Sequence, residues 1–204
     1  MGVVLIVDTS NSFSLSLFHN DNLVCCFTNS DRLCSNSIVS YINEMLNNAS
    51  ISVNDIDYLG VSVGPGSYTG IRVGYSFSLG LCQALNKKMV VFNILEAVYS
   101  YLKDIYIVNI VYPVINANNN NLFTLLDGVV TKISIFEFQK LLLSARNPLV
   151  VLLDSVFDEC FSNSNIKIVR ISNICEAVYY FVRRNIDGKK FCDIRKYRVD
   201  YFED

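Results

Sequence analysis

A glycine-rich stretch at residues 64–74, with the sequence GPGSYTGIRVG, has the residue types of an anion-binding loop. It follows an apolar, β-prone run and leads into a helix predicted for residues 69–85. Thr69 is the expected N-cap of this helix, and the hydroxyl of Ser67 can accept from the same free amides. Such a helix start exposes amide donors and the positive end of the helix dipole, which together favour an anion. The candidate anion-binding residues of this stretch are Gly66, Ser67 and Thr69.

Two common phosphate-binding motifs do not describe this stretch. A Walker A loop needs a Lys-Ser or Lys-Thr pair after its glycines, and the GxGxxG spacing of dinucleotide-binding proteins differs as well. A tight strand-to-helix connection without any ligand is the alternative interpretation, because glycine and proline suit a sharp turn by themselves.

Side chains for metal or nucleophilic chemistry are scarce in the rest of the sequence. His19 is the single histidine, and it lies in a predicted hairpin turn. A metal-dependent transferase needs a cluster of His, Asp or Glu at ligand spacing, and a Ser/His/Asp triad needs a histidine beside its serine. We therefore expect neither catalytic residues nor a metal site in this chain.

The elements that would position the stretch follow from the pattern of apolar residues. In the first half, strands are expected at residues 3–7, 13–18, 23–27, 58–63 and 89–92, and helices at residues 35–46, 69–85 and 95–102. Three meandering strands followed by helix-linked strands is the order of a ribonuclease-H-like, actin-like (ASKHA) unit. In the second half, strands are expected at residues 105–115, 122–126, 129–133, 149–153 and 166–171, and helices at residues 136–144 and 174–185.

The predicted fold class is therefore α/β, with mixed sheets, flanking helices and two lobes. The first lobe is expected at residues 1–100 and contains the glycine-rich stretch. A smaller and more divergent second lobe is expected at residues 101–204.

Asp8 follows the first predicted strand, the apolar run at residues 3–7. In actin-like ATPases an aspartate at this place helps to hold metal and phosphate, and a glycine-containing hairpin usually follows it. Here residues 9–12 read Thr-Ser-Asn-Ser without glycine, which favours a capped turn. Asp8 and Thr9 are the candidate nucleotide-binding residues of this segment.

Composition and charge are those expected of a cytoplasmic protein without a membrane segment. The seven cysteines form no CxxC pair, which is typical of free thiols in a reducing compartment. The longest apolar run, at residues 105–115, is too short to cross a bilayer. The net charge of −2 gives no general attraction to nucleic acid. A basic cluster between residues 183 and 198 is either a solvated face or an RNA-binding surface.

The glycine-rich stretch closely resembles the signature of the TsaB (YeaZ) family, and so does the opening VLIVDTS at residues 4–10. The resemblance covers residues 1–100 and weakens beyond them. It implies an actin-like fold and a non-catalytic subunit that forms a heterodimer with TsaD. In that family TsaD carries the metal and transfers a threonylcarbamoyl group to the adenosine beside the anticodon of tRNAs that read codons starting with A.

Cofactors and further partners also follow from this resemblance. TsaE, an ATPase, joins the larger bacterial complex. This chain alone would bind no cofactor, because ATP and a metal are expected in the partner subunits. Its contact with tRNA would be indirect.

The resemblance further implies a helical interface with TsaD, built from the helices at residues 35–46 and 69–85. Small residues recur every four positions in the second helix, in one row of Gly70, Gly74 and Ser78 and in another of Ser76, Gly80 and Ala84. Either row could admit a partner helix or pack on this chain's own sheet. The candidate partner-binding residues are Ile38, Tyr41, Ile42, Gly70, Ile71, Gly74, Tyr75, Ser78 and Leu79. Apart from the two glycines, all of them are expected to be exposed. Without TsaD, this face is expected to support a homodimer.

Two hypotheses of different classes follow. The leading one is a scaffold subunit that activates TsaD. The alternative is a stand-alone actin-like ATPase or small-molecule kinase that uses Asp8 and the loop at residues 64–70 on phosphates. One departure from the family concerns Asn116, Ala117 and Asn118, which stand where relatives have Asp-Ala-Arg, so that both charges are missing here.

Overall fold

The chain folds into two compact α/β units. The computed structural model describes residues 2–29, 37–105, 110–153, 166–171, 174–193 and 199. The first unit comprises Met1–Asn93 and Val182–Asp204, and the second comprises Ile94–Phe181. The boundary predicted at residue 100 falls inside helix α3 (Ile94–Ile105), and the chain re-enters the first unit within helix α5 (Cys175–Asp187). Much of the predicted basic cluster, from residue 194 to residue 198, lies outside the described residues.

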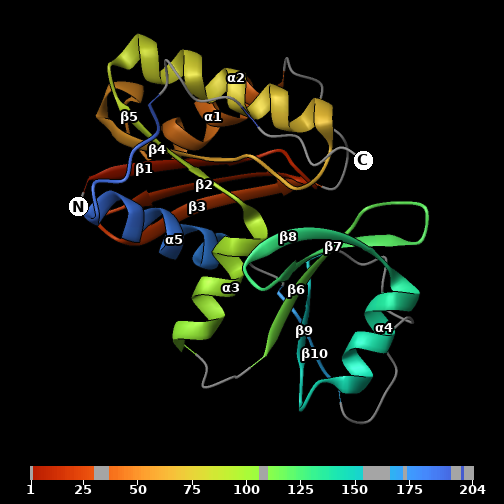
Figure 1. Ribbon diagram of the computed structural model, residues 1–204. Coiled ribbons are helices and arrows are strands. Elements are labelled where there is room, and N and C mark those ends of the chain that lie inside the picture. Colours follow the sequence, from red (N-terminus) through yellow and green to blue (C-terminus); the bar gives the residue numbers. More distant parts are fainter. Residues whose placement is uncertain are drawn as a thin grey trace. The chain divides into compact units, whose positions relative to one another are not determined.

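The first unit contains a five-stranded mixed sheet in the order β3-β2-β1-β4-β5 (Figure 1). Its strands are β1 (Val3–Asp8), β2 (Phe13–His19), β3 (Asn22–Asn29), β4 (Ile56–Ser62) and β5 (Lys88–Phe92). The first three pair antiparallel, and β1, β4 and β5 run parallel. This arrangement confirms the predicted order of three meandering strands followed by helix-linked strands.

Helices α1 (Ser37–Asn48) and α2 (Tyr68–Leu85) cover one face of this sheet, as Figure 1 shows. A single 3-10 turn, Val53–Asp55, precedes β4. The apolar stripe of α1 packs on inward-facing strand residues such as Leu5 and Leu59, and all of its members lie in one core cluster, namely Ile38, Ile42, Met45 and Leu46. These residues form the apolar face of the helix, and it points to the sheet.

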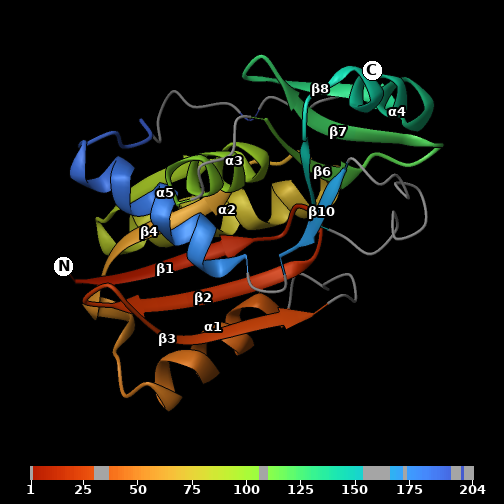
Figure 2. The same cartoon turned by 90° about the horizontal axis from the view of Figure 1, so that it is seen from below.

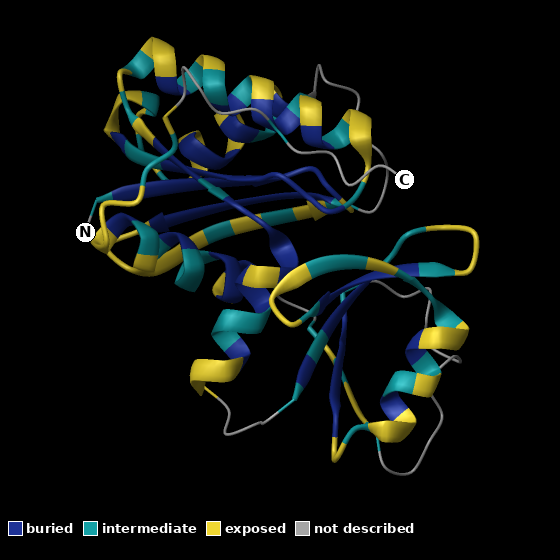
Figure 3. Ribbon diagram, viewed as in Figure 1, coloured by how far each residue is buried: buried dark blue, intermediate teal, exposed yellow. Residues whose placement is uncertain are grey.

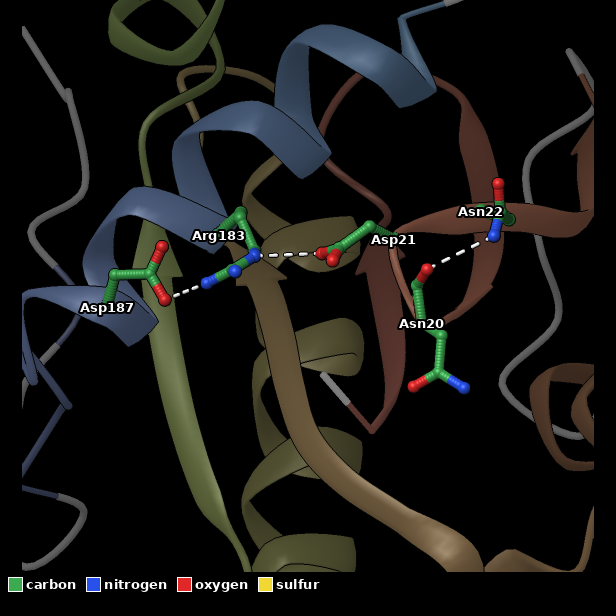
Figure 4. Close-up of polar contacts among 5 residues, drawn as sticks. All are labelled: Asn20, Asp21, Asn22, Arg183 and Asp187. Carbon is green, nitrogen blue, oxygen red and sulfur yellow. Dashed lines mark hydrogen bonds and ion pairs between the residues drawn. The ribbon is translucent and has the colours of Figure 1, made fainter.

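The last part of α5 lies on the opposite face of the same sheet (Figure 2). Val182 packs directly over Gly60 of β4, where a Cβ would come within 2.9 Å of a valine methyl. The next residue, Arg183, joins α5 to the β2–β3 hairpin, because its Nε donates to Asp21 Oδ1 at 2.8 Å. Figure 4 shows this side chain between Asp21 and Asp187, with which it also forms an ion pair. Asp21 occupies the hairpin with φ 68°, a backbone conformation that Asn and Asp tolerate best.

The second unit contains a sheet in the order β10-β9-β6-β7-β8. Its elements besides α3 and α5 are β6 (Val111–Asn116), β7 (Asn121–Leu126), β8 (Val129–Ser134), α4 (Ile135–Ser144), β9 (Leu149–Leu152) and β10 (Lys167–Arg170). Alternate residues of β9 face opposite sides: Val150 and Leu152 pack with α4, whereas Leu149 and Val151 pack with α3. Both faces are covered, which accounts for the unbroken apolar run of this strand.

The strand predicted for residues 105–115 is shorter than expected. Ile105 is the last residue of α3, and β6 begins at Val111. Helix α3 thus ends three residues after the predicted end at residue 102, and residues 106–109 lie outside the described residues. In the parts of the chain that the structure describes, no helix is long and apolar enough to cross a membrane.

Candidate functional site

The glycine-rich stretch and the turn after β1 meet at one edge of the first sheet. Strands β1 and β4 are parallel neighbours, so their carboxyl ends lie side by side. Thr9 and Ser10 follow β1, and the stretch at residues 64–74 follows β4. Ligands of open α/β sheets bind at such an edge, so this edge is the candidate ligand-binding site of the first unit.

Thr9 occupies a groove along the first two turns of α2. Its hydroxyl donates to the carbonyl oxygen of Gly70 at 2.6 Å. A Cβ at Gly70 would come within 2.0 Å of the Thr9 carbonyl oxygen, and a Cβ at Gly74 within 2.2 Å of Thr9 Oγ1. Both glycines are therefore required by the approach of this chain's own turn.

Ser10 closes the next part of the loop. The amide of Ser67 donates to the Ser10 carbonyl oxygen at 2.6 Å. A Cβ at Gly66 would come within 2.2 Å of the same oxygen. Gly66, Gly70 and Gly74 thus form a cradle, at a spacing of four residues, in which Thr9 and Ser10 lie.

The Asp8 side chain stabilises the turn after β1 through hydrogen bonds to Ser10. Its Oδ1 accepts from the Ser10 amide at 2.9 Å and from the Ser10 hydroxyl at 2.6 Å. The Ser62 hydroxyl donates to Ser10 Oγ at 3.3 Å, and the Gly64 amide donates to Ser62 Oγ at 3.4 Å. Burial raises the pKa of the Asp8 carboxyl above its ordinary value, although the bonds from Ser10 and Ser62 oppose this rise. The sequence had not singled out Ser10 and Ser62; their position after β1 and at the end of β4 was the available signal.

The start of α2 differs from the prediction at one residue. Ser67, not Thr69, is the N-cap, and its hydroxyl accepts from the Gly70 amide at 3.2 Å. Thr69 lies exposed in the first turn. The helix begins earlier because Ser67 has the extended backbone of a cap, whereas Tyr68 is already helical. The amides of Ser67 and Gly70 therefore already have partners within the chain, and the proposed anion-binding role of Gly66, Ser67 and Thr69 stays a prediction.

The predicted exposure of the partner-binding residues is wrong for most of them. Tyr41, Gly70 and Leu79 are partly exposed, but the other members of the set are buried, namely Ile38, Ile42, Ile71, Gly74, Tyr75 and Ser78. The buried residues of α2 recur at intervals of three and four along one stripe. The sheet and the turn after β1 cover this stripe. Both its apolar and its small residues therefore pack against other parts of this chain. Whether any of these residues takes part in binding a partner stays a prediction.

The second row of small residues lies on the exposed side of α2. Ser76, Gly80 and Ala84 are exposed, and a Cβ added at Gly80 would meet no atom of the described residues within 4 Å. Figure 3 shows buried and exposed residues alternating along this helix. On α1, Val39 is a large apolar side chain that is 50% exposed. We call Ser76, Gly80 and Ala84 the open row, and Gly70, Gly74 and Ser78 the filled row.

Groups for metal or nucleophilic chemistry do not converge in the described parts of the chain. Within those ranges no three His, Cys, Asp or Glu side chains are placed to hold a metal ion. His19 lies at the β2–β3 hairpin, with Nε2 at 3.2 Å from the Asn20 side chain. Burial raises the pKa of Cys82 to about 12, so this thiol does not ionise near neutral pH.

The departure at residues 116–118 forms a self-contained turn between β6 and β7. Asn118 donates its amide to Asn116 Oδ1 at 2.9 Å, and Asn121 donates its amide to the Asn118 carbonyl at 2.9 Å. Asn118, Asn119 and Asn120 all have positive φ, a backbone conformation that asparagine tolerates better than most other residues do. This loop lies in the second unit.

Comparison with known proteins relates this chain to a protein family. Residues 28–134, more than half of the chain, match the family model for TsaD, tRNA N6-adenosine threonylcarbamoyltransferase. A protein of that name from Prosthecochloris aestuarii is 34% identical over 88 residues, which are 43% of this chain and 26% of that protein. The tRNA threonylcarbamoyladenosine biosynthesis protein TsaB of Buchnera aphidicola is 31% identical over 85 residues, which are 41% of this chain and 39% of that protein. The match therefore spans less than half of the length of either relative.

A solved structure is similar over the whole chain. YeaZ from Pseudomonas aeruginosa superposes with a TM-score of 0.77 at 15% sequence identity, covering 99% of this chain and 100% of that one. This likeness concerns the fold, and it confirms the predicted α/β class with two mixed sheets and flanking helices. Because the family model matches more than half of this chain, the chain belongs to the family of TsaD, tRNA N6-adenosine threonylcarbamoyltransferase, and TsaB proteins are among its relatives.

Proposed function

We propose that this chain is a non-catalytic TsaB-type subunit that acts with TsaD in forming threonylcarbamoyladenosine in tRNA. The names of its relatives support a role in this biosynthesis. The modified base would be the adenosine beside the anticodon in tRNAs that read codons starting with A. ATP and a metal would be held by the partner subunits, TsaD and TsaE, and tRNA would be met through the complex.

The observation that carries the non-catalytic role is the filled cradle of the glycine-rich stretch. A phosphate would need the backbone of Gly66 and Gly70 to be approachable, as in other glycine-rich loops. Here the carbonyl oxygens of Thr9 and Ser10 already lie where Cβ atoms of those glycines would be. The Asp8 carboxylate is likewise buried and accepts both bonds from Ser10. The loop thus serves to attach α2, which disfavours the alternative of a stand-alone ATPase or kinase.

The surface that we assign to TsaD is the open row of α2 together with the neighbouring exposed side of α1. Small side chains at a spacing of four let a second helix backbone approach closely, and among the described residues none lies within 4 Å of a Cβ added at Gly80. Val39 adds an exposed apolar group on α1. The partner-binding region thus keeps the two predicted helices but uses their outer sides. In the absence of TsaD the same side would pair with a second copy.

The first test is co-purification of the full chain with its cognate TsaD, followed by a tRNA threonylcarbamoylation assay with and without the chain. We expect a stable complex and activity that requires both proteins. Gly80→Leu fills the open row and is expected to weaken the complex about tenfold or more, which corresponds to about 1.4 kcal/mol. Lys140→Leu places the same side chain on exposed α4 and is the matched control.

Three outcomes would contradict the proposal or a part of it. Activity that is indifferent to this chain would remove the role in tRNA modification. Magnesium-dependent ATP binding by the isolated chain in calorimetry, lost in Asp8→Ala, would instead favour the ATPase alternative. A Gly80→Leu variant that binds TsaD like the wild type would exclude the open row as the docking side.

A further inference from the structure

We infer that Thr9 is a positioning residue that sets the orientation of α2 and thereby presents the open row to a partner. The inference rests on the proposed function, because it concerns the surface assigned there to TsaD. Thr9 lies in the loop between β1 and β2 and is 8% exposed, on the inner side of α2. A partner docked on the outer side would not touch it.

Three contacts join Thr9 to the first two turns of the helix. The hydroxyl donates to the Gly70 carbonyl at 2.6 Å, which is a short and direct bond. A carbonyl oxygen has two lone pairs, so this bond can be made beside the helical one. The Thr9 carbonyl oxygen and the Thr9 side chain fill the space over Gly70 and Gly74, respectively.

The turn that carries Thr9 is itself fixed on both sides. Before Thr9, Asp8 holds the Ser10 amide and hydroxyl. After it, the Ser10 carbonyl accepts from the Ser67 amide immediately before the helix. Thr9 therefore joins the end of a central, buried strand to the start of a helix through short hydrogen bonds. These bonds restrict the movement of the helix start relative to the strand.

The open row begins only two residues after the last contact of Thr9. Gly74 is the second glycine under Thr9, and Ser76 is the first member of the open row. A helix is stiff over this length, so a tilt or rotation at its first two turns is transmitted to Ser76 and Gly80. A change at Thr9 should thus alter partner binding without altering any atom of the docking surface.

The side chain offers two separable features. The hydroxyl makes the bond to Gly70, and the methyl lies 3.3 Å from the Cβ position of Gly74. Thr9→Val keeps the branched shape and removes the donor, whereas Thr9→Ser keeps the donor and removes the methyl. Thr124→Val is the matched control, because that hydroxyl is fully buried in the second unit and has no hydrogen-bond partner among the described residues.

The experiment measures the Kd for TsaD and the hydrogen exchange of α2 amides in the full chain, at a temperature at which all variants are folded. For Thr9→Val we expect about fivefold weaker binding, the equivalent of one lost hydrogen bond, and faster exchange at the first turns of α2. Thr9→Ser should restore most of the affinity, and Thr124→Val should change neither quantity. A purely structural role would lower the melting temperature of Thr9→Val without weakening TsaD binding.

The outcomes separate this inference from the proposed function. If Thr9→Val leaves exchange in α2 as in the wild type, Thr9 does not position the helix, whatever TsaD does. If exchange rises but TsaD binds Thr9→Val normally while Gly80→Leu weakens binding, the docking side stands and the positioning role is overturned. If the wild type itself fails to bind TsaD, the proposed function falls, and the link from Thr9 to a partner falls with it.

Discussion

The two rows of small residues on α2 have the same spacing and opposite surroundings. In the filled row, Gly70 and Gly74 lie against the β1 turn, and Ser78 is fully buried. In the open row, no atom from the described part of the chain lies within 4 Å of a Cβ added at Gly80. Both rows recur every four residues and belong to one helix of 18 residues. The spacing therefore indicates that a backbone can approach the helix closely at either row. Only the surroundings of each row show whether that backbone belongs to this chain.

The difference has a physical origin in how the helix is rotated about its axis. The stripe that carries Ile71, Tyr75 and Cys82 is the most apolar side, and burying it against the sheet gives the largest gain. Gly70 and Gly74 lie on the edge of this stripe that meets the turn after β1. Gly80 lies on the outer side, so its row is left for water or for a partner.

The largest effect is expected from alanine at matched glycines of the two rows. Gly70→Ala pushes a methyl to 2.0 Å from a backbone oxygen, and such overpacking costs about 1–3 kcal/mol. Gly80→Ala enters open space and should raise stability by about 0.5–1 kcal/mol, because alanine is the better helix former. Urea unfolding of both variants measures the difference. Equal midpoints would show that the two rows do not differ in packing.

A second effect concerns the carboxyl that holds the turn of the filled row. The pKa of Asp8 is raised above its ordinary value of 3.8, chiefly by burial. The folded state then binds the proton more tightly than the unfolded state, so this group lowers stability as the pH rises from 3.8 through the folded pKa. Asp8→Asn still accepts from Ser10 but has no charge to bury. We expect it to be at least as stable as the wild type at neutral pH.

The measurement is the free energy of unfolding of both proteins from acid to neutral pH. The difference between the wild type and Asp8→Asn isolates the contribution of Asp8, since all other acids are shared. This difference should favour Asp8→Asn increasingly as the pH rises. A variant that loses stability at neutral pH would show that the charged carboxylate is favoured in the turn.

The smallest effect is expected on the other face of the sheet, where one surface ion pair joins α5 to the β2–β3 hairpin. Arg183 and Asp21 are joined at 2.8 Å, with side chains 31% and 50% exposed (Figure 4). Exposed pairs contribute at most about 1 kcal/mol, and salt screens them. A double-mutant cycle with Arg183→Met and Asp21→Asn should give a coupling within that limit that falls with added salt. A larger, salt-independent coupling would mean that α5 is held as firmly as α2.

Much of the fold could be predicted because its signals are local. The unbroken apolar run of β1, the alternation in β2 and the helical stripe of α1 each specify an element by period alone. The end of α3 could not be predicted to the residue, because no side chain from residue 103 to Ile105 is buried and would mark it in the apolar pattern. The N-cap was misplaced by two residues because Ser67 and Thr69 are both good caps and only the backbone distinguishes them.

The candidate site was harder to predict, because its partners are far apart in the sequence. The glycines of the stretch suggested a phosphate, but the atoms that fill the cradle come from Thr9 and Ser10, about sixty positions earlier. Similarly, Ile71 and Ser78 were expected on the outside, although they face the sheet. No local pattern states which side of a helix a distant turn will cover.

The order of strands and helices, the place of the tight connection after β4 and the two rows of small residues on α2 could all be predicted from residue types and their spacing, which act over a few neighbours. Which row is filled and which is open could not be predicted in this way. That choice depends on the rotation of α2 over the sheet and on the turn that Asp8 holds beneath it, and both arise when segments distant in the chain pack together.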